Sequence, residues 1–404
     1  MASQDGSDIS PVFEAQRSAY VHVPFCRRRC FYCDFPVSVT GDRRHGGNFS
    51  PVDRYVDSLC QEIQTWSGQG KMGLETVFFG GGTPSLLTVG QVEKILRAID
   101  GVFGIVPGAE ISIEVDPGTF DRDKIAGYIG SGVNRFSLGV QAFQDELLQV
   151  CGRSHSVAEI HSAIEILNAV GADNFSIDLM SGLPYQTPQQ WQESLSKAVA
   201  IAPAHISVYD TIVEPKTPFA RYYEPGVFPL PDDDTSAEFY RQTQKVLTTA
   251  GYEHYEISNY AKPGFQCRHN RVYWHNRSYY GFGMGATSYV NGQRFSRPRT
   301  TTKYAQWVET FVANNGKINC EVVTERDRLL ETLMLGLRLA EGVSLDAIAS
   351  EFGQETVDTI LEILQPYIEK EWVKMIPERN AIRLSDPEGF LYSNAVLSSL
   401  FADG

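Results

Sequence analysis

Residues 20–33 read YVHVPFCRRRCFYC and place a group of cysteines directly after a short apolar run. The run Tyr20–Phe25 has the length and composition of a buried strand. Cys26, Cys30 and Cys33 follow it with C-x-x-x-C-x-x-C spacing, whereas the other four of the seven cysteines are scattered singly. An odd and low number of cysteines in 404 residues does not form a disulfide framework. The clustered three are therefore candidate ligands of a metal centre.

The spacing of these cysteines distinguishes three kinds of site. A zinc site normally takes four ligands in two separated pairs, and the sequence has no second pair. A redox dithiol needs only C-x-x-C, which leaves Cys26 without a role. Three thiolates on one loop instead suit three irons of a 4Fe–4S cluster and leave the fourth iron open. Arg27, Arg28 and Arg29 within the loop would offset the negative charge of such a cluster. Chance clustering of three structural cysteines is the remaining alternative.

Five further β-rich runs follow the first, and segments with helical spacing of apolar residues separate them. The runs are Thr76–Phe79, Glu110–Val115, Arg135–Val140, Asn174–Met180 and His205–Val213, and the clearest helices are Val52–Trp66, Val89–Phe103, Val157–Val170 and Ala237–Ala250. Six strand-then-helix units predict parallel strands joined by right-handed crossovers. Because a closed barrel needs eight such units, we expect a partial (β/α)6 TIM-like barrel, with a doubly wound sheet as the alternative.

The chain is expected to divide into four parts. These are a flexible N-terminus at 1–16, the core barrel at 17–250, an aromatic-rich extension at 251–320 and a C-terminal domain at 321–404. The stretch Gly251–Arg299 is expected to be irregular loop packed across the barrel mouth. The C-terminal domain is expected to contain the helices Thr324–Leu339, Ser344–Phe352 and Glu355–Glu369, followed by a strand pair at 372–377 and 381–385. Three helices and a hairpin predict a small winged-helix-like α+β module.

The charge balance excludes several classes of protein. The chain has 35 basic and 49 acidic residues, a net charge of −14. From residue 324 onward there are 7 basic and 15 acidic residues, so the winged-helix-like module lacks the cations that a DNA-binding surface needs. No apolar run approaches the roughly 18 residues of a membrane span, although transient membrane association is an open alternative. The first residues resemble no signal or transit peptide, so we expect a cytoplasmic protein, or an organellar one if the N-terminus is shortened.

Glycines and polar residues follow the strands at their carboxyl ends, where parallel α/β folds place their chemistry. Gly80–Pro84 (GGGTP) follows the second run, and its glycines allow a ligand to approach the backbone closely. Glu114 ends the third run, Gln141 the fourth, and Asp178 lies in the fifth. The carboxylates of Glu114 and Asp178 can accept hydrogen bonds from hydroxyl or amine groups of a ligand. Asp116 is interpreted as a solvated loop charge.

These segments together resemble the radical S-adenosylmethionine superfamily, and within it the coproporphyrinogen III dehydrogenase family, over almost the whole chain. The resemblance rests on the cysteine loop, GGGTP, IEVDP at 113–117, SLGVQ at 137–141, GRSH at 152–155 and IDLMSGLP at 177–184. It implies a 4Fe–4S cluster on Cys26, Cys30 and Cys33 with S-adenosylmethionine at the open iron. It also implies cofactor contacts at Tyr20, Tyr32, Gly81, Gly82, Thr83, Glu114, Gln141, Arg153 and Asp178. Arg153 can pair with a carboxylate as a fork.

Two departures from the dehydrogenase pattern bear on the function. The dehydrogenase loop continues with Cys-x-Cys, whereas Asp34 and Phe35 follow Cys33 here. The dehydrogenase also carries a longer N-terminal arm, and this chain has 19 residues before Tyr20. The chain instead has HNxxYW at His269–Trp274, which is similar to the motif of heme chaperones that branch from the family.

The HNxxYW motif has side chains that suit heme. A neutral imidazole is a common axial ligand of heme iron, and Tyr and Trp offer flat apolar faces to the macrocycle. The candidate heme residues are His269, Asn270, Tyr273 and Trp274, with Cys267 as a further candidate ligand. Arg268 and Arg271 could pair with the heme propionates. The alternative is that His269 is a hydrogen-bonded loop histidine and that the aromatic residues belong to the core.

Two functions from different classes are therefore expected. The first is a heme chaperone that carries a 4Fe–4S cluster and S-adenosylmethionine, binds heme and passes it to an acceptor protein. An electron donor such as flavodoxin or ferredoxin is a further expected partner, and nucleic acid is not. The second is an oxygen-independent coproporphyrinogen III dehydrogenase or another radical enzyme. Because the two departures favour the chaperone, we expect no enzyme activity and assign no catalytic residue.

Overall fold

The computed structural model describes residues 16–41, 51–67 and 73–402. The expected flexible N-terminus, residues 1–16, lies outside this range except for its last residue. No helix in the described ranges combines the length and apolar content that a membrane crossing would need.

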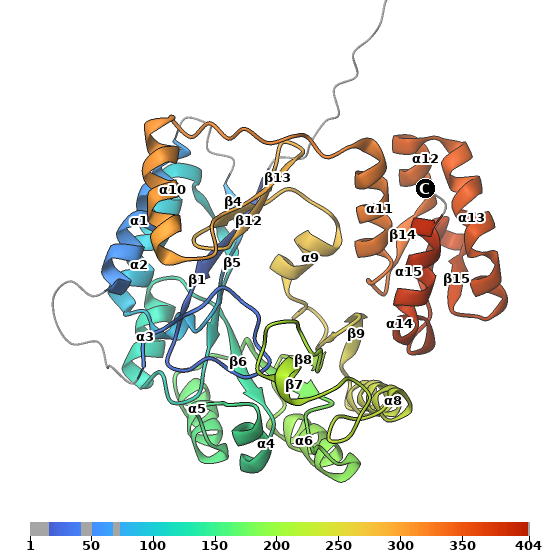
Figure 1. Cartoon of the computed structure of the whole chain (residues 1–404), viewed down its shortest axis with the longest axis horizontal. Coiled ribbons are helices and arrows are strands. Elements are labelled where there is room, and N and C mark those ends of the chain that lie inside the picture. The colour runs from blue at the N-terminus through green and yellow to red at the C-terminus, as the bar shows by residue number, and fades with distance from the viewer. Residues whose placement is uncertain (1–15, 42–50, 68–72, 403–404) are drawn as a thin grey trace, which may run out of the picture.

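A nine-stranded sheet with the order β11-β1-β4-β5-β6-β7-β8-β10-β9 forms the framework of the larger part of the molecule (Figure 1). Its six central strands are parallel and are β1 (Ser18–Val23), β4 (Leu74–Gly81), β5 (Ile105–Val115), β6 (Arg135–Gln141), β7 (Phe175–Ser181) and β8 (His205–Asp210). These correspond to the six runs expected from the sequence. Neighbours in this part of the sheet follow chain order without the reversal of a doubly wound sheet. The partial barrel is therefore confirmed.

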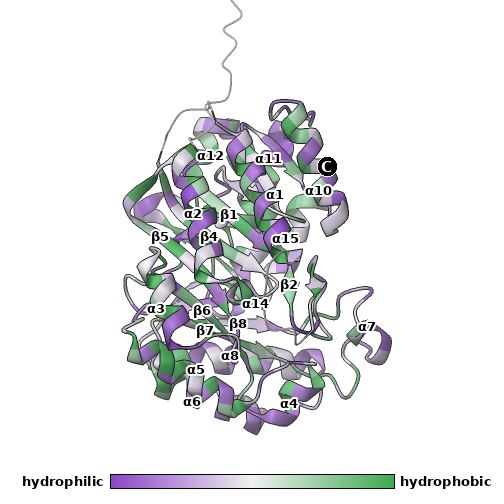
Figure 2. Ribbon diagram, turned by 90° about the vertical axis from the view of Figure 1, so that its left-hand side faces the viewer, coloured by the Kyte–Doolittle hydropathy of each residue, from purple (hydrophilic) through white to green (hydrophobic). Residues whose placement is uncertain are grey.

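Helices that follow these strands in the chain cover the outer face of the sheet, and the ribbon coloured by hydropathy shows both apolar and polar residues along them (Figure 2). They are α1 (Pro51–Thr65), α2 (Val89–Phe103), α3 (Arg122–Gly130), α4 (Asp145–Val150), α5 (Val157–Ala169), α6 (Pro188–Ile201) and α8 (Asp233–Thr249). Capping boxes at Thr88, Ser156 and Thr187 fix where three of them begin. These well-defined starts place the preceding loops at the carboxyl ends of the strands.

The extension differs from the irregular loop expected for Gly251–Arg299. It contains β9 (Glu253–Glu256), β10 (Asn259–Ala261), α9 (Arg268–Trp274), β11 (Tyr280–Phe282), β12 (Thr287–Val290), β13 (Gln293–Ser296) and, beyond it, α10 (Thr301–Ala313). Strand β10 pairs with β8 and β11 pairs with β1, so the extension lengthens both edges of the sheet. The expectation of irregular structure was wrong because strands of three or four residues are too short to show a period.

The C-terminal part confirms the expected helices and hairpin. It contains α11 (Glu325–Gly336), β14 (Val343–Ser344), α12 (Leu345–Phe352), α13 (Gln354–Glu369), β15 (Val373–Ile376) and β16 (Ala381–Leu384). Two further helices, α14 (Glu388–Leu391) and α15 (Ser393–Ala402), were not expected. This part has a hydrophobic core of its own, centred on fully buried side chains such as Leu364 and Ile382. The domain boundaries at 250 and 320 remain predictions.

Ion pairs hold the C-terminal part against the barrel and its extension. Arg241 of α8 pairs with Glu388, and Arg271 of α9 pairs with Glu341. The main chain adds a bond from the Ile257 N–H to the carbonyl of Arg338. Because Arg271 lies in α9, the segment with the HNxxYW motif is tied to the C-terminal part, beside which it lies in Figure 1.

Candidate functional site

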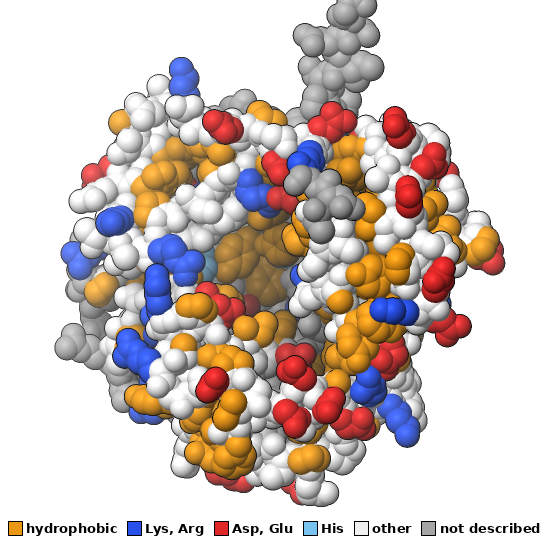
Figure 3. Space-filling model, turned by 45° about the vertical axis from the view of Figure 1, so that its right-hand side comes forward, with side chains coloured by type: hydrophobic (Ala, Val, Ile, Leu, Met, Phe, Trp, Pro, Cys, Tyr) orange, Lys and Arg blue, Asp and Glu red, His pale blue; other side chains and the backbone are white. Residues whose placement is uncertain are grey.

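The carboxyl ends of the parallel strands open into a cavity of ≈ 510 Å³, a size typical of small-molecule sites. All three clustered cysteines and all nine expected cofactor residues line it: Cys26, Cys30, Cys33, Tyr20, Tyr32, Gly81, Gly82, Thr83, Glu114, Gln141, Arg153 and Asp178. The fold thus brings together residues that are up to 158 positions apart in the chain. Figure 3 shows a hollow with hydrophobic walls on the face that it presents.

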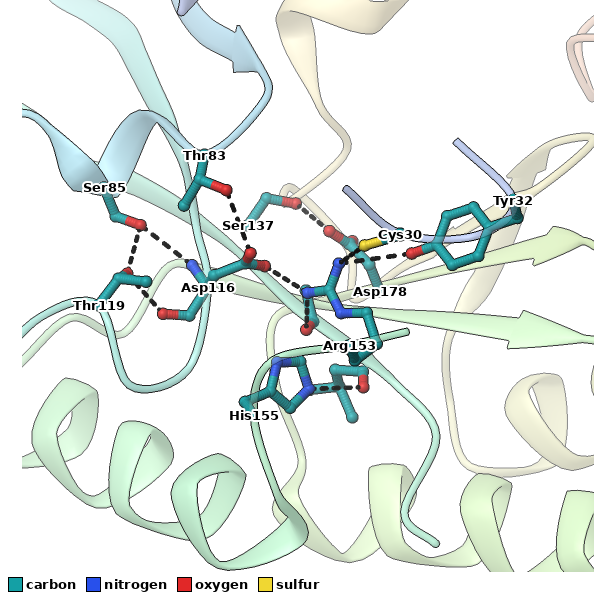
Figure 4. A network of polar contacts seen from close by, with 12 residues as sticks. Cys30, Tyr32, Thr83, Ser85, Asp116, Thr119, Ser137, Arg153, His155 and Asp178 are labelled. Atoms are coloured by element: carbon teal, nitrogen blue, oxygen red, sulfur yellow. Dashed lines mark hydrogen bonds and ion pairs between the residues drawn. The ribbon is translucent and has the colours of Figure 1, made fainter. Parts of the chain in front are cut away.

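Arg153 is the centre of a polar network at one wall of the cavity (Figure 4). Its Nη2 forms an ion pair with Asp116 and donates to the carbonyl oxygen of Gly139 at 3.1 Å. Its Nη1 lies 3.4 Å from both the Cys30 Sγ atom and the Tyr32 hydroxyl oxygen. The guanidinium therefore places positive charge directly against the cysteine loop. Burial by itself lowers the pKa of Arg153, but the charge of Asp116, together with Tyr32 and Cys30, keeps that pKa well above the usual value.

Asp116 corrects the interpretation of this residue as a solvated loop charge. Its carboxylate pairs with Arg153 and accepts a hydrogen bond from the Thr83 hydroxyl at 3.3 Å. The three residues Thr83, Asp116 and Arg153 lie on three different loops, which meet at this carboxylate. The sequence around Asp116 does not reveal partners that are so distant in the chain. Asp116 lines the cavity and is a candidate site residue that sequence reasoning missed.

Glu114 and Asp178 face the cavity from neighbouring parts of the barrel. Glu114 accepts a hydrogen bond from the Gly81 N–H at 3.0 Å, and burial together with the nearby Asp178 raises its pKa to about 8. Asp178 accepts hydrogen bonds from Ser137 at 2.8 Å and Ser176 at 3.1 Å, and burial raises its pKa as well. Near neutral pH the Glu114 carboxyl is largely protonated, so it can donate as well as accept a hydrogen bond.

The glycines at and directly after the end of β4 allow this strand to approach the cysteine loop. Gly82 donates its N–H to the carbonyl of Val23, and a Cβ atom at Gly82 would lie 2.9 Å from the Cys26 Sγ atom. Gly81 has a φ of 119°, and a Cβ atom there would lie 2.5 Å from the His22 ring. A larger residue at Gly82 would therefore displace the loop that carries the cysteines, and one at Gly81 would displace the His22 ring of β1.

The donor set of the cysteine loop fits a 4Fe–4S cluster. Cys26, Cys30 and Cys33 are free thiols that line one cavity. Burial raises the pKa of Cys26 to about 12 and also raises the pKa of Cys33. In the described ranges, no group of three or more His, Cys, Asp or Glu side chains is arranged to hold a single metal ion. A cubane cluster differs from such a site because each cysteine ligates its own iron. The neighbouring guanidinium of Arg153 would stabilise the thiolates that iron requires.

His269 lies deeper in the same cavity, beside the middle of β4, and is 0% exposed. Its Nδ1 lies 2.8 Å from the Thr76 hydroxyl oxygen and its Nε2 lies 2.8 Å from that of Tyr273. Its ring stacks on Phe78 at 5.3 Å. In this conformation the imidazole has the two hydrogen bonds of a buried structural histidine, and burial lowers its pKa to about 3.

The other expected heme residues separate into two groups. Asn270 and Tyr273 line the cavity with His269, whereas Trp274 and Cys267 do not. Cys267 is fully buried with its Sγ atom 3.7 Å from Glu110. Arg268 donates to the carbonyl of Gly108, near the amino end of β5, and Arg271 pairs with Glu341. Neither arginine lines the cavity, so the expected propionate pairing has no support in this conformation.

Glu110 positions helix α9 and was not expected to do so. Its buried carboxylate accepts hydrogen bonds from the backbone N–H groups of Arg268 and His269, both at 3.0 Å. These are the free donors at the start of α9, so the carboxylate caps the helix from strand β5. The alternation of Glu110, Ser112 and Glu114 in β5 was a usable signal, because it places all three on one face of the strand.

Comparison with known proteins identifies the superfamily and the fold. The Radical SAM superfamily model matches residues 20–198, and the HemN C-terminal domain model matches residues 323–390. The fold resembles that of coproporphyrinogen III oxidase (HemN) from Escherichia coli, a radical SAM enzyme, with a TM-score of 0.80. That likeness covers 96% of this chain and 91% of the other, at 24% identity. The fold and the cysteine loop thus define a radical SAM protein with HemN-like architecture.

Curated relatives place the chain more narrowly. Heme chaperone HemW of Synechocystis sp. is 49% identical, over 95% of this chain and 96% of the relative. Heme chaperone HemW of Bacillus subtilis is 34% identical, over 96% of this chain and 100% of the relative. The mitochondrial radical S-adenosyl methionine domain-containing protein 1 of Bos taurus is 31% identical, over 85% and 78%. The chain belongs to the heme chaperone HemW family.

Proposed function

We propose that the protein is a heme chaperone that binds heme and transfers it to an acceptor protein. The observation that carries this proposal is that His269, Asn270 and Tyr273 of the HNxxYW segment face the same cavity as the cysteine loop. The family relation to proteins named heme chaperone HemW supports it. Asp34 and Phe35, in place of a Cys-x-Cys continuation of the loop, also support a role other than that of the dehydrogenase.

The resident cofactors in this proposal are a 4Fe–4S cluster and S-adenosylmethionine. Cys26, Cys30 and Cys33 would hold three irons, and the nine lining residues expected from the sequence would bind S-adenosylmethionine. When bound, the cluster would supply one-electron reduction of S-adenosylmethionine. Arg153 holds positive charge beside Cys30, and Glu114 offers a carboxyl that can donate or accept. Nη2 of Arg153 is already paired with Asp116, so only its Nη1 atom has no carboxylate partner.

His269 is the proposed axial ligand of heme iron. Iron binds neutral imidazole, and burial keeps His269 neutral throughout the physiological range because it lowers the pKa to about 3. Its Nε2 would have to exchange the Tyr273 hydroxyl for iron. Asn270, Tyr273 and Trp274 are proposed heme contacts, and Cys267 is a proposed ligand only if α9 moves, because its thiol is 0% exposed.

The likeness to HemN keeps a second function under consideration, namely oxidative decarboxylation of coproporphyrinogen III or another radical reaction. The complete set of cofactor residues in the cavity favours it. In either case an electron donor such as flavodoxin or ferredoxin is the proposed partner for the cluster. Transfer to an acceptor protein in the cytoplasm belongs to the first proposal alone, as does transient contact with a membrane.

Two assays on one anaerobically reconstituted sample distinguish these functions. A chaperone binds hemin stoichiometrically, loses that binding in His269→Ala, and forms no protoporphyrinogen IX from coproporphyrinogen III. His161→Ala, which changes an exposed histidine of α5, is the matched control and retains hemin binding. Sustained turnover of coproporphyrinogen III would overturn the proposal, and so would a wild-type protein that fails to bind hemin.

A further inference from the structure

We infer that Arg135 is a carboxylate-binding residue at the deep end of the cavity, and that it pairs with a propionate of the heme whose iron His269 binds. This inference deepens the proposed heme function and rests on it. Arg135 is the first residue of β6 and belongs to none of the motifs or cofactor residues described above. It lines the same cavity as His269.

The alternation of side chains along β6 directs Arg135 into the cavity. Arg135, Ser137, Gly139 and Gln141 all line it, as expected for every second residue of one strand. Gln141 lies at the carboxyl end of β6, whereas Arg135 lies six residues earlier, about 20 Å away along the strand. A carboxylate held at the open iron of a cluster would lie at the carboxyl ends of the strands. Arg135 is therefore placed for a different anion.

The Arg135 guanidinium has no hydrogen bond or ion pair with the residues that the structure describes. The residue is only 2% exposed, and its Nε atom is buried without a hydrogen-bond partner. Arg153, another arginine of the cavity wall, is instead paired with Asp116. Removal of a guanidinium from water without a partner is strongly unfavourable. An arginine buried in this way beside a cavity is therefore typical of a site that a ligand anion completes.

The acidic residues near Arg135 are bound to other groups. Burial lowers the pKa of Arg135, but nearby groups, Cys267 and Glu110 foremost, raise it above its usual value, so the side chain is charged. The Glu110 carboxylate accepts the two backbone N–H groups at the start of α9. Asp178 accepts hydrogen bonds from two serine hydroxyls. The hydrogen-bonding capacity of the guanidinium is therefore left for a ligand.

The position of Arg135 relative to His269 fits a heme that is bound through its iron. His269 lies against Thr76 of β4, and Arg135 lies on β6, with β5 between these two strands. Alternate strands of a sheet are about 10 Å apart, which is comparable with the distance from heme iron to the propionate carboxylates. The register aligns Thr76 with Glu110 and Arg135 with Ser112, one step of the two-residue period apart. A heme on His269 can therefore reach Arg135 with its propionate edge.

Arg135 is also the cation that the HNxxYW segment does not supply to the cavity. Arg268 and Arg271 form their contacts outside it. The other arginines that line the cavity belong to the cysteine loop or, in the case of Arg153, pair with an aspartate. Among the cavity arginines in the described part of the chain, Arg135 alone combines deep burial with an unpaired guanidinium, which suits the bidentate binding of a carboxylate.

Hemin and hemin dimethyl ester test the inference, because the ester has the same iron and ring but no charged propionate. In the reconstituted full chain, Arg135→Gln should weaken hemin binding by about tenfold, measured by Soret titration, and leave ester binding unchanged. Arg135→Lys retains the charge and should recover part of the loss. The position of the Soret maximum should stay that of the wild type, because His269 still binds iron. Arg379→Gln, at an exposed arginine of the C-terminal part, is the matched control and should bind both compounds like the wild type.

A stability measurement separates this role from a structural one. Because Arg135 has no hydrogen bond to lose, hemin-free Arg135→Gln should melt no lower than the wild type. Arg297→Gln provides the contrast, since it breaks a fully buried ion pair with Glu62 and should lower the melting temperature. If Arg135→Gln melts lower and weakens hemin and ester equally, Arg135 supports the fold and the inference is overturned.

The remaining outcomes keep the inference distinct from the proposed function. If Arg135→Gln binds hemin like the control, the inference is overturned although the chaperone proposal stands. If this variant retains hemin but loses S-adenosylmethionine, measured by calorimetry on the hemin-free protein, the carboxylate belongs to S-adenosylmethionine and the inference is again overturned. If the wild type binds neither hemin nor its ester, the proposed function itself fails.

Discussion

The Nε2 atom of His269 lies 2.8 Å from the hydroxyl oxygen of Tyr273, one turn further along helix α9. The proposed iron ligand is therefore held by another member of its own motif. Because Thr76 occupies the second ring nitrogen, iron can bind only after one of these bonds is exchanged. We expect the bond to Tyr273 to be the one that exchanges, because both His269 and Tyr273 line the cavity and Thr76 does not.

Removal of this hydroxyl should strengthen heme binding. Tyr273→Phe retains the aromatic face but frees Nε2, and a hydrogen bond of this kind has a net value of about 1 kcal/mol, or about fivefold in affinity. Hemin titration followed by the Soret band measures the change. Tyr279→Phe, which alters an adjacent tyrosine that packs on Tyr273, is the control. Weaker binding in Tyr273→Phe would show that the hydroxyl assists the ligand rather than competes with iron.

Loss of the Glu110 carboxylate should release helix α9. Glu110→Gln leaves two buried N–H groups, those of Arg268 and His269, with a single acceptor oxygen, and we expect a loss of about 1–3 kcal/mol in the free energy of unfolding. Urea unfolding measures it. Glu75→Gln is the control because Glu75 forms an exposed pair with Arg17 and should change stability by less than about 1 kcal/mol. Equal effects in the two variants would contradict the capping role.

The raised pKa of Glu114 predicts a pH dependence of stability. Its folded pKa of about 8 exceeds the usual value of 4.5, so its stabilising effect is complete below about pH 4.5 and is lost as pH rises through about 8. Glu114→Gln lacks this titration. We therefore expect the melting temperature of the variant, relative to the wild type, to rise between pH 5 and pH 8.5. A difference that is constant with pH would exclude a protonated Glu114 in the folded protein.

The cluster assignment is tested by iron content. Cys30→Ser should lose the bound iron and the brown colour of the reconstituted protein, because three protein thiolates hold a cluster with an open iron. Cys320→Ser changes a cysteine outside the cavity and should retain both. Unchanged iron in Cys30→Ser would refute the cluster.

Much of the fold could be predicted because it depends on local periodicity. Helix α2 begins and ends at the predicted residues, Val89 and Phe103, since an apolar stripe and a capping box define it within the segment itself. The expectation failed for Gly251–Arg299, where β10 and β11 have only three residues each and exist through pairing with β8 and β1. Such strands are set by their partners rather than by their own pattern.

The sequence by itself determined the cysteine loop and the residues at the ends of the parallel strands, because parallel strands direct their carboxyl ends to one edge. Only the tertiary structure decided which of these residues meet. It paired Asp116 with Arg153, and it set His269 against Thr76, 193 positions earlier in the chain. It also brought Phe35 and Ile212 to one cavity. Contacts across such separations depend on how the strands of the sheet and α9 are arranged in space. No local pattern of residues encodes that arrangement.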